Sequence, residues 1–277
     1  MTVAVVIIAA GRPSHLVHTL AALRGQTTAP DDAIVVDMRP ERSIAHVVQP
    51  PVRWIGLETS DEHLPLAAAR NAGAAATDAD RLVFLDVDCI AAPDLVERYT
   101  EVVEGYPGVL ACGPVRYLRP EWAEGRDVST AGAGLDLDSM SDPHPARTPP
   151  RGRHIRMGND HELFWSLSFG CSRATWTTIG GFDEGYQGYG GEDTDFAFRA
   201  REVGVPLAWF AGGTAYHQWH APTRHDIGRL PEIVANAQRF YDRWGTWPMT
   251  GWLEDLHQRG RVVFDPLRGR LELVPGS

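Results

Sequence analysis

Apolar residues in the first part of the chain form short continuous runs, separated by segments in which they recur every three or four positions. Such runs, rich in Val, Ile, Leu and Phe, are typical of buried strands. The runs lie at residues 3–10, 33–37, 52–56 and 81–86. The segments between them have helical spacing or are rich in Ala, which predicts helices. These helices are expected at residues 14–24, 65–76 and 93–104.

The alternation of strands and helices predicts an α/β fold with a mostly parallel central sheet and helices on both of its faces. The lack of apolar–polar alternation within the runs agrees, because strands covered on both faces read as near-continuous apolar runs. In such sheets, ligands bind at the carboxyl ends of the strands. Asp37, Asp86 and Asp88 follow two of the runs, so we expect them at that edge.

The pattern loosens after Leu118. Residues 119–160 are rich in Pro, Gly, Asp, Arg and Ser and show little periodicity, so we expect a flexible flap. Periodicity returns later, with a helix expected at residues 194–203 and a strand at 206–216. The last part of the chain reads as a helical tail with several tryptophans. The four segments are residues 1–118, 119–160, 161–225 and 226–277.

The composition is that of a globular chain and excludes some partners. The 277 residues carry a formal net charge of −10, which argues against non-specific binding to nucleic acid or to an anionic membrane. No apolar run approaches the ~20 residues needed for a transmembrane segment, and the first run lacks the basic flank of a signal peptide. The three separated cysteines match no disulfide framework, so we expect a cytoplasmic protein.

Two carboxylates stand where the strand at 81–86 ends. Asp86 and Asp88 are separated by Val87, and residues i and i+2 of an extended segment point to the same side. Neighbouring carboxylates repel each other, so a cation is expected beside them. Hard oxygen ligands at an open strand end favour Mg²⁺ or Mn²⁺. The alternative is that Asp86 caps a turn and Asp88 is solvated.

A Gly pair followed by three acidic residues is a second candidate site. Gly190 and Gly191 allow a sharp turn or a close approach to a ligand, and Glu192, Asp193 and Asp195 then open a helix. Acidic residues in a first turn also complement the helix dipole, which is the purely structural interpretation. That interpretation needs only one or two acids. Three of them indicate a site where a carboxylate accepts a proton from a substrate hydroxyl.

Two histidines, His217 and His220, follow the strand expected at residues 206–216. A lone histidine is more often structural, but one that ends a strand is a candidate in a chain that already needs a metal ligand. Imidazole together with carboxylates suits Mn²⁺.

Together these motifs resemble the GT-A fold glycosyltransferases, specifically family 2 with the galactosyltransferase-type C-terminal motif. The most specific match is GGFDE…YGGEDTDFAFR, at residues 180–199, which is similar to G-G-F-D-E…W-G-G-E-D-x-D. VVIIAAGRP with AIVVD resembles the nucleotide-binding half, and ARNAG at residues 69–73 resembles A-R-N-x-G. LDVDC is similar to the D-x-D strand end, and Tyr216-His217 to the downstream metal histidine.

This resemblance implies a Rossmann-like sheet whose first half, residues 1–118, binds a nucleotide-sugar donor, with UDP as the expected nucleotide. Asp37 would contact the base or ribose, Asp86 the ribose and a metal-bound water, and Asp88 the metal, Mn²⁺ or Mg²⁺. His217 would be the further metal ligand, with His220 as second choice. The other donor-binding residues that the resemblance implies are Ala9, Ala10, Arg12, Arg70 and Val87.

The resemblance also assigns residues 161–225 to the acceptor and to catalysis. Asp193 would deprotonate the hydroxyl of a small-molecule or glycan acceptor, which predicts inversion at the anomeric carbon, and the flap would exclude water. Glu192 would bind the acceptor or donor sugar. The other sugar-binding residues expected are Trp165, Tyr189 and Gly191. Tyr189 replaces the Trp that is frequent in the family, and Asp37 lacks the usual second acid after it, so the acceptor and the base contacts are expected to differ.

Two other functions stay open at this point. One is a sugar-phosphate nucleotidyltransferase, because AAGRPSH faintly resembles the start of that family, although the extended Gly-rich loop and Lys are missing. The other is a non-catalytic sugar- or metal-binding protein in which the acids are structural. Trp165 and Trp219 are the preferred sugar-stacking pair among the tryptophans. The Trp-rich tail is a candidate contact for a homodimer.

Overall fold

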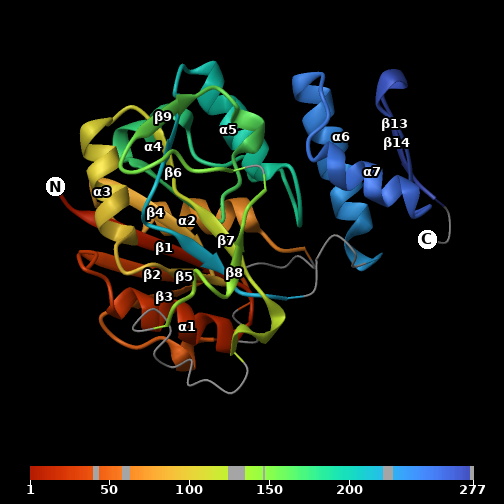
Figure 1. Ribbon diagram of the computed structural model, residues 1–277. Coiled ribbons are helices and arrows are strands. Elements are labelled where there is room, and N and C mark those ends of the chain that lie inside the picture. Colours follow the sequence, from red (N-terminus) through yellow and green to blue (C-terminus); the bar gives the residue numbers. More distant parts are fainter. Residues whose placement is uncertain (40–43, 58–62, 124–134, 146, 221–226, 275–277) are drawn as a thin grey trace.

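Strands and helices alternate as expected in a computed structural model of the protein, which is shown in Figure 1. The described residues are 1–39, 44–57, 63–123, 135–145, 147–220 and 227–274. The main sheet has eight strands in the order β3–β2–β1–β4–β10–β6–β11–β9. In that order they are β3 (Arg53–Gly56), β2 (Asp32–Asp37), β1 (Val3–Ala9), β4 (Arg81–Asp86), β10 (Ser168–Ser172), β6 (Leu110–Cys112), β11 (Leu207–Phe210) and β9 (Ile155–Gly158).

The first four strands of this sheet are parallel, which puts their carboxyl ends at one edge. β10 and β9 run antiparallel to their neighbours, so the sheet is mixed rather than purely parallel. Alternate residues of β1 enter two separate cores, one on each face. The first core is covered by α1 (Pro13–Arg24) and α3 (Leu95–Gly105). The second is covered by α2 (Leu66–Ala75), α4 (Arg173–Ile179) and α5 (Glu192–Glu202).

Helix α2 lies very close to the sheet. A Cβ on Gly73 would lie 2.2 Å from Cγ1 of Val6 and 3.2 Å from Cγ2 of Val36. The glycine of the ARNAG segment therefore has a packing role, because only a residue without a side chain permits this approach.

A second, four-stranded sheet lies across the carboxyl end of β4. Its strands, in order, are β5 (Cys89–Ala91), β12 (Ala215–His217), β7 (Val115–Leu118) and β8 (Ser141–Pro143). The single strand expected at residues 206–216 is therefore wrong: it is two strands, β11 and β12, in different sheets. Gly212 and Gly213, both in the left-handed region at φ 79° and 63°, make the turn between them.

The helix expected from Ser14 begins at Pro13, directly after Arg12, whose φ of 57° is left-handed. The segment at residues 119–160 contains more regular structure than its sequence suggests, namely β8, β9 and the 3₁₀ turn η3 (Pro120–Ala123). Residues 124–134 and 146 of this segment lie outside the described part, and closure of a flap stays a prediction.

The tail lies beside the sheet, in blue in Figure 1, and has a small core of its own. It consists of η7 (Ile227–Arg229), α6 (Leu230–Trp244), α7 (Thr250–Gln258), β13 (Val262–Asp265), η8 (Pro266–Arg268) and β14 (Arg270–Leu273). The remaining 3₁₀ turns are η2 (Ala45–Val47) and η5 (His161–Leu163). Across the described residues, no helix combines the length and apolarity that crossing a membrane requires.

Candidate active site

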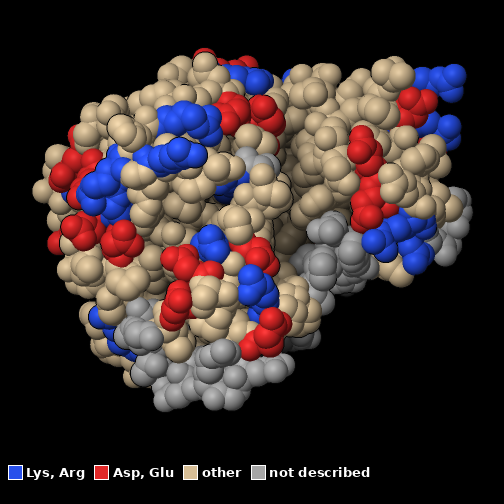
Figure 2. Space-filling view, in the orientation of Figure 1, with Lys and Arg blue, Asp and Glu red and all other residues tan. Residues whose placement is uncertain are grey.

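A cavity of about 790 Å³ opens at the carboxyl ends of β1 and β4, where the sheet faces the tail. Figure 2 shows the hollow between the two parts of the molecule. The regions that line it include the sheet edge with Ala10, Arg12, Asp86 and Val87, helix α2, residues 162–167, the start of α5, and the tail. Its size is typical of a small-molecule site.

Asp88, His217 and His220 come together next to this cavity, where Asp88 pairs with the lining residue Arg12. One ligand atom from each lies within 4.8 Å of the other two. Nε2 of His217 lies 3.6 Å from Oδ1 of Asp88, and Nε2 of His220 lies 3.3 Å from Oδ2. The sequence offered His220 only as an alternative to His217, whereas the structure places both histidines beside Asp88.

The pairing of β5 with β12 explains this convergence. Asp88 immediately precedes β5, and Cys89 of that strand lies opposite His217. The backbone N–H of Gln218 donates to the carbonyl of Asp88 at 2.7 Å, which fixes the register. Residues separated by more than a hundred positions therefore meet because a short sheet crosses the end of β4.

The charges at this cluster fit a divalent cation. Burial alone would raise the pKa of Asp88, but His217, His220 and Arg12 together hold the pKa of its carboxyl below the usual value. Burial lowers the pKa of His217, so its imidazole is neutral at pH 7, the form that ligates metals. One carboxylate and two imidazoles are a suitable donor set for a divalent transition-metal ion.

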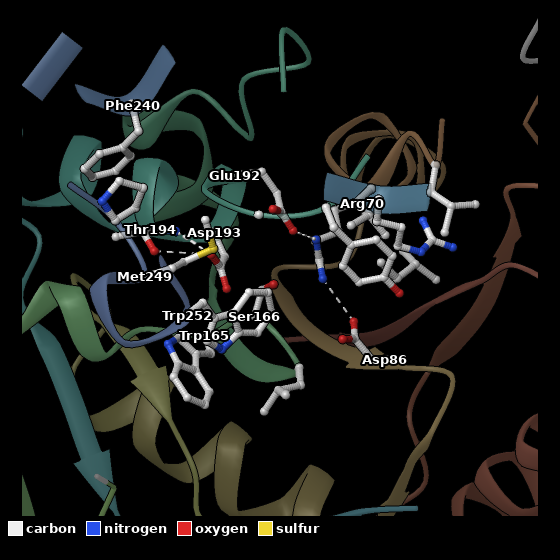
Figure 3. Close-up of a pocket in the computed structure, with 18 of the residues that line it drawn as sticks. Arg70, Asp86, Trp165, Ser166, Glu192, Asp193, Thr194, Phe240, Met249 and Trp252 are labelled. Atoms are coloured by element: carbon white, nitrogen blue, oxygen red, sulfur yellow. Dashed lines mark hydrogen bonds and ion pairs between the residues drawn. The ribbon is translucent and has the colours of Figure 1, made fainter. Parts of the chain in front are cut away.

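Arg70 bridges the two acidic motifs, as the dashed lines in Figure 3 show. Its Nη2 lies 3.0 Å from Oδ1 of Asp86 and its Nη1 lies 3.3 Å from Oε1 of Glu192. Burial raises the pKa of Asp86 to about 6 and that of Glu192 to about 7, against the lowering effect of Arg70. Asp86, expected to reach the metal through a water, is thus paired with a guanidinium.

Asp193 lines the cavity at the start of α5, next to Glu192. Its Oδ1 accepts a hydrogen bond from the backbone N–H of Thr194 at 2.7 Å. Burial raises the pKa of Asp193, and the cationic Arg70 and Arg147 partly offset this effect. A carboxylate with a raised pKa beside a cavity has the properties of a general base.

Arg147 is a buried residue that the sequence did not single out. Its guanidinium donates to the carbonyls of Leu163 at 2.8 Å and Trp165 at 3.3 Å, and lies 5.1 Å from the centre of the Trp165 ring. Its side chain comes from the segment expected to be a flap, where an isolated Arg gives no signal of burial. It fixes the backbone on which Trp165 enters the cavity.

Asp195, the third acid of its motif, has a structural role. It is fully buried, its Oδ2 lies 3.0 Å from Nε of Arg199, and its Oδ1 accepts from the indole N–H of Trp244 at 2.9 Å. It does not line the cavity. The structural interpretation therefore applies to this acid, because its partners are Arg199 and Trp244 and not the cavity.

The predicted donor residues are unequally placed. Ala10, Arg12 and Val87 line the cavity, and Nη1 of Arg12 pairs with Oδ2 of Asp88. Ala9 and Asp37 are fully buried. The carboxylate of Asp37 accepts from three N–H groups, of Arg39, Ile44 and Trp54. Residues 40–43 beside it lie outside the described part, so its contact with a base, like that of Ala9 with the donor, stays a prediction.

The predicted acceptor residues are also divided. Trp165 and Tyr189 line the cavity, whereas Gly191, at φ 85°, shapes the turn that precedes α5. Trp219, the other preferred sugar-stacking residue, is half-exposed and does not line the cavity. The sequence missed the cavity residues of the tail because aromatic residues there resemble ordinary core packing. They include Arg229, Phe240, Trp247, Met249 and Trp252.

Comparison with known proteins agrees with this geometry. Residues 4–176 match the model of glycosyl transferase family 2, and residues 153–221 match the model described as N-terminal domain of galactosyltransferase. Validoxylamine A glucosyltransferase from Streptomyces hygroscopicus subsp. limoneus is 28% identical over 260 residues, covering 85% of this chain and 55% of the relative. Chondroitin synthase from Escherichia coli is 26% identical over 238 residues, covering 77% and 34%.

A solved structure of GalNAc-T7 with UDP, GalNAc and Mn²⁺ is similar with a TM-score of 0.58 at 14% identity. The match covers 93% of this chain and 57% of that chain, and it confirms the GT-A fold. The chain thus spans little more than half the length of the validoxylamine A glucosyltransferase and of GalNAc-T7. Because one family model covers more than half of the residues, the chain belongs to glycosyl transferase family 2.

Proposed function

We propose that the protein is a metal-dependent glycosyltransferase that moves a sugar from a nucleotide-sugar donor, with UDP as the nucleotide, to a hydroxyl of a small-molecule or glycan acceptor. Asp193 is the base and the reaction inverts the anomeric carbon. The observation that carries this proposal is the convergence of Asp88, His217 and His220 beside Arg12, which lines the same cavity as Asp193.

The donor end of the site is ionic. Asp88, His217 and His220 would hold the metal, and their two imidazoles favour Mn²⁺ over Mg²⁺, which prefers oxygen ligands. When bound, the metal supplies positive charge that neutralises the leaving nucleoside diphosphate. Arg12 lies beside the same carboxylate and lines the cavity, so it is placed to bind a phosphate oxygen.

The chemical step needs one base and one direction of attack. Asp193 accepts the proton of the acceptor hydroxyl while its oxygen forms a bond to the anomeric carbon, and the bond from that carbon to the diphosphate oxygen breaks. Attack on the face opposite the leaving group inverts the configuration. Burial raises the pKa of Asp193 and so strengthens it as a base. Arg70 pairs with the neighbouring Asp86 and Glu192 and lowers the pKa of each, against the larger effect of burial.

The relatives support this proposal by their names. One is a glucosyltransferase of validoxylamine A, another is a chondroitin synthase, and the similar solved structure contains UDP, GalNAc and Mn²⁺. A cytoplasmic location and a homodimer through the tail stay predictions. Of the tail tryptophans, Trp247 is buried and stacks on Tyr241 at 4.2 Å, so it packs within the chain.

The proposal is tested by incubating the protein with UDP-sugars and a panel of hydroxyl acceptors, with Mn²⁺ or EDTA. Proton NMR of the new anomeric centre then reads its configuration. We expect metal-dependent transfer with inversion. Retention of configuration would contradict the role of Asp193 as base.

The two rival functions give different results in the same assay. A sugar-phosphate nucleotidyltransferase would release pyrophosphate from a nucleoside triphosphate and a sugar phosphate. A non-catalytic binding protein would bind UDP-sugar with Mn²⁺ but release no UDP with any acceptor.

A further inference from the structure

The tail makes the wall of the cavity on the side opposite the ionic donor end. Of the described residues that line the cavity, those from position 240 onward are all uncharged, whereas Arg12, Arg70 and Asp86 lie at the sheet edge. In the tail, the cationic Arg229 also lines the cavity, but it lies 3.6 Å from the carboxylate of Glu232 and over the ring of Tyr189. We therefore place a diphosphate beside Arg12 and Arg70 at the sheet edge, and the acceptor in the space beside Met249 and Trp252.

Hydrogen bonds attach this wall to residues 187–191, the turn that leads into Glu192 and Asp193 and is called the catalytic turn below. The carboxylate of Glu232 in α6 accepts from the backbone N–H of Tyr189 at 3.1 Å. The amide of Asn236 donates to the carbonyls of Gln187 at 2.8 Å and Tyr189 at 3.1 Å. The tail is therefore attached to the residues that lead directly into Glu192 and Asp193, although it lies beyond the segment that the family models match.

Met249 is the part of the wall nearest to the catalytic turn. A Cβ on Gly190 would lie 2.8 Å from Cε and 2.9 Å from Sδ of Met249, so the thioether rests on that glycine. Figure 3 shows its side chain pointing into the cavity on the side where Asp193 lies. The backbone of Met249 is left-handed at φ 49°, a conformation that a residue with a long side chain rarely adopts. Strain of this kind is concentrated at functional sites.

The chemistry of this wall selects a class of acceptor. Trp252 of the tail and Trp165, which is held by Arg147, line the cavity as partly buried indoles, and Met249 adds apolar surface. Such surfaces bind the apolar faces of rings by stacking and S–aromatic contact, and they offer few partners to hydroxyl groups that lie against them. Asp193 then faces the hydroxyl.

Building on the proposed function, we infer that residues 246–252 form the acceptor subsite and that the acceptor carries an aromatic or carbocyclic ring next to its reacting hydroxyl. The ring lies against Trp252 and Met249, and the hydroxyl lies at Asp193. Trp252 and Met249 thus determine specificity for the acceptor and not for the donor.

The inference is tested by saturation-transfer NMR on the protein with UDP and Mg²⁺, using phenyl, cyclohexyl and methyl glucosides as probes. The phenyl and cyclohexyl probes separate an aromatic from a carbocyclic preference. We expect at least one of them to bind fivefold or more tightly than the methyl glucoside, with the strongest saturation on its ring protons. Equal affinities, or no binding by any probe, would overturn the inference.

Variants assign the effect to the tail. Trp252→Ala and Met249→Ala should reduce the preference to below twofold, and Met249→Leu should keep most of it. Leu267→Ala, at a residue of the same tail that is 96% exposed, is the matched control and should change nothing. A preference that survives in Trp252→Ala would contradict the inference. Titration of UDP into the wild type and each variant separates the two proposals. If the wild type did not bind UDP, the proposed transferase function would be contradicted. If it bound UDP but showed no preference for the ring-bearing probes, only the inferred class of acceptor would be contradicted.

Discussion

The two ends of the cavity are built in different ways. The donor end joins ionisable side chains from β4, from β12 and from the loop after β1, and its charges have partners, as in the Asp86–Arg70–Glu192 bridge. The tail end is apolar and is held by packing and by hydrogen bonds from α6 to the catalytic turn. Under the proposed function, the comparison teaches that charge and metal binding would select the donor, whereas shape and apolar surface would select the acceptor. Asp193 lies where the two ends meet.

The largest expected effect on transfer comes from Asp193→Asn, which removes the proposed base. Asp193 lies between the two ends of the cavity. Transfer should fall by about 10²–10⁴-fold, because that is the usual contribution of a positioned proton acceptor. UDP binding should change by less than about twofold if donor binding depends on the ionic end. Initial rates and calorimetric titration of UDP measure the two quantities. Asp142→Asn, an exposed acid, is the control. Unchanged transfer in Asp193→Asn would show that the base lies elsewhere.

The ionic end is tested separately with His217→Ala and His220→Ala. Each variant should bind Mn²⁺ at least about tenfold more weakly, since one of three ligands is lost. The loss of the free Mn²⁺ signal in electron paramagnetic resonance measures binding without any need for activity. His257→Ala in the tail is the matched control, because its ring contacts Val262 and not the cluster. If His217→Ala and wild type bound Mn²⁺ equally, the donor end would have to be reassigned.

The pH dependence of kcat/KM reports on Asp193 and Glu192, which lie between the ionic end and the tail end of the cavity. Glu192 has a pKa of about 7 and the pKa of Asp193 is also raised, in both cases mainly by burial. A base acts when it has lost its proton, so kcat/KM should rise with pH as these coupled acids ionise and fall as they are protonated.

Removing a nearby cation should move this pH profile upward. Arg147→Met takes away a positive charge that lowers the pKa of Asp193, so the ascending limb should shift to higher pH. Arg119→Met, at an exposed Arg paired with Asp142, should leave the profile in place. A shift toward lower pH in Arg147→Met would contradict the electrostatic role of this residue.

The smallest effect on function, although a clear one on stability, is expected from Gly73→Ala. The added methyl would meet Val6 at 2.2 Å, so the free energy of unfolding should fall by about 1–3 kcal/mol from overpacking. Gly105→Ala is the control, since nothing lies within 4 Å of its added Cβ. Denaturant unfolding measures both. Equal stability of the two variants would mean that α2 can move away from the sheet at little cost.

The residues that meet at the donor end could largely be predicted from the sequence, because they belong to short recognisable motifs. Asp86 and Asp88 follow a buried run, Arg70 lies in ARNAG, and Asp193 follows a Gly pair. The sequence could not show that His220 joins His217, because this depends on the pairing of β12 with β5. Nor could it separate the structural Asp195 from Asp193, since the difference lies in contacts with Arg199 and Trp244.

The tail end was not predictable for a physical reason. Aromatic and apolar residues have the same pattern whether they fill a core or line a cavity. Trp244, which packs on Phe198, and Trp252, which lines the cavity, are therefore distinguished only by the structure. Arg147 is a similar case, because a single Arg in a Pro-rich segment is usually solvated. The flap expected at residues 119–160 contains β8 and β9 instead of structureless chain, since each strand finds a partner elsewhere in the chain.

The most direct test of the account is calorimetric titration of UDP into the protein with Mn²⁺ and with EDTA, repeated for Asp88→Asn. The account predicts tight binding that depends on Mn²⁺ in the wild type, and weak binding that Mn²⁺ does not improve in the variant. UDP binding of equal strength with EDTA, or an Asp88→Asn variant that binds as well as the wild type, would contradict it.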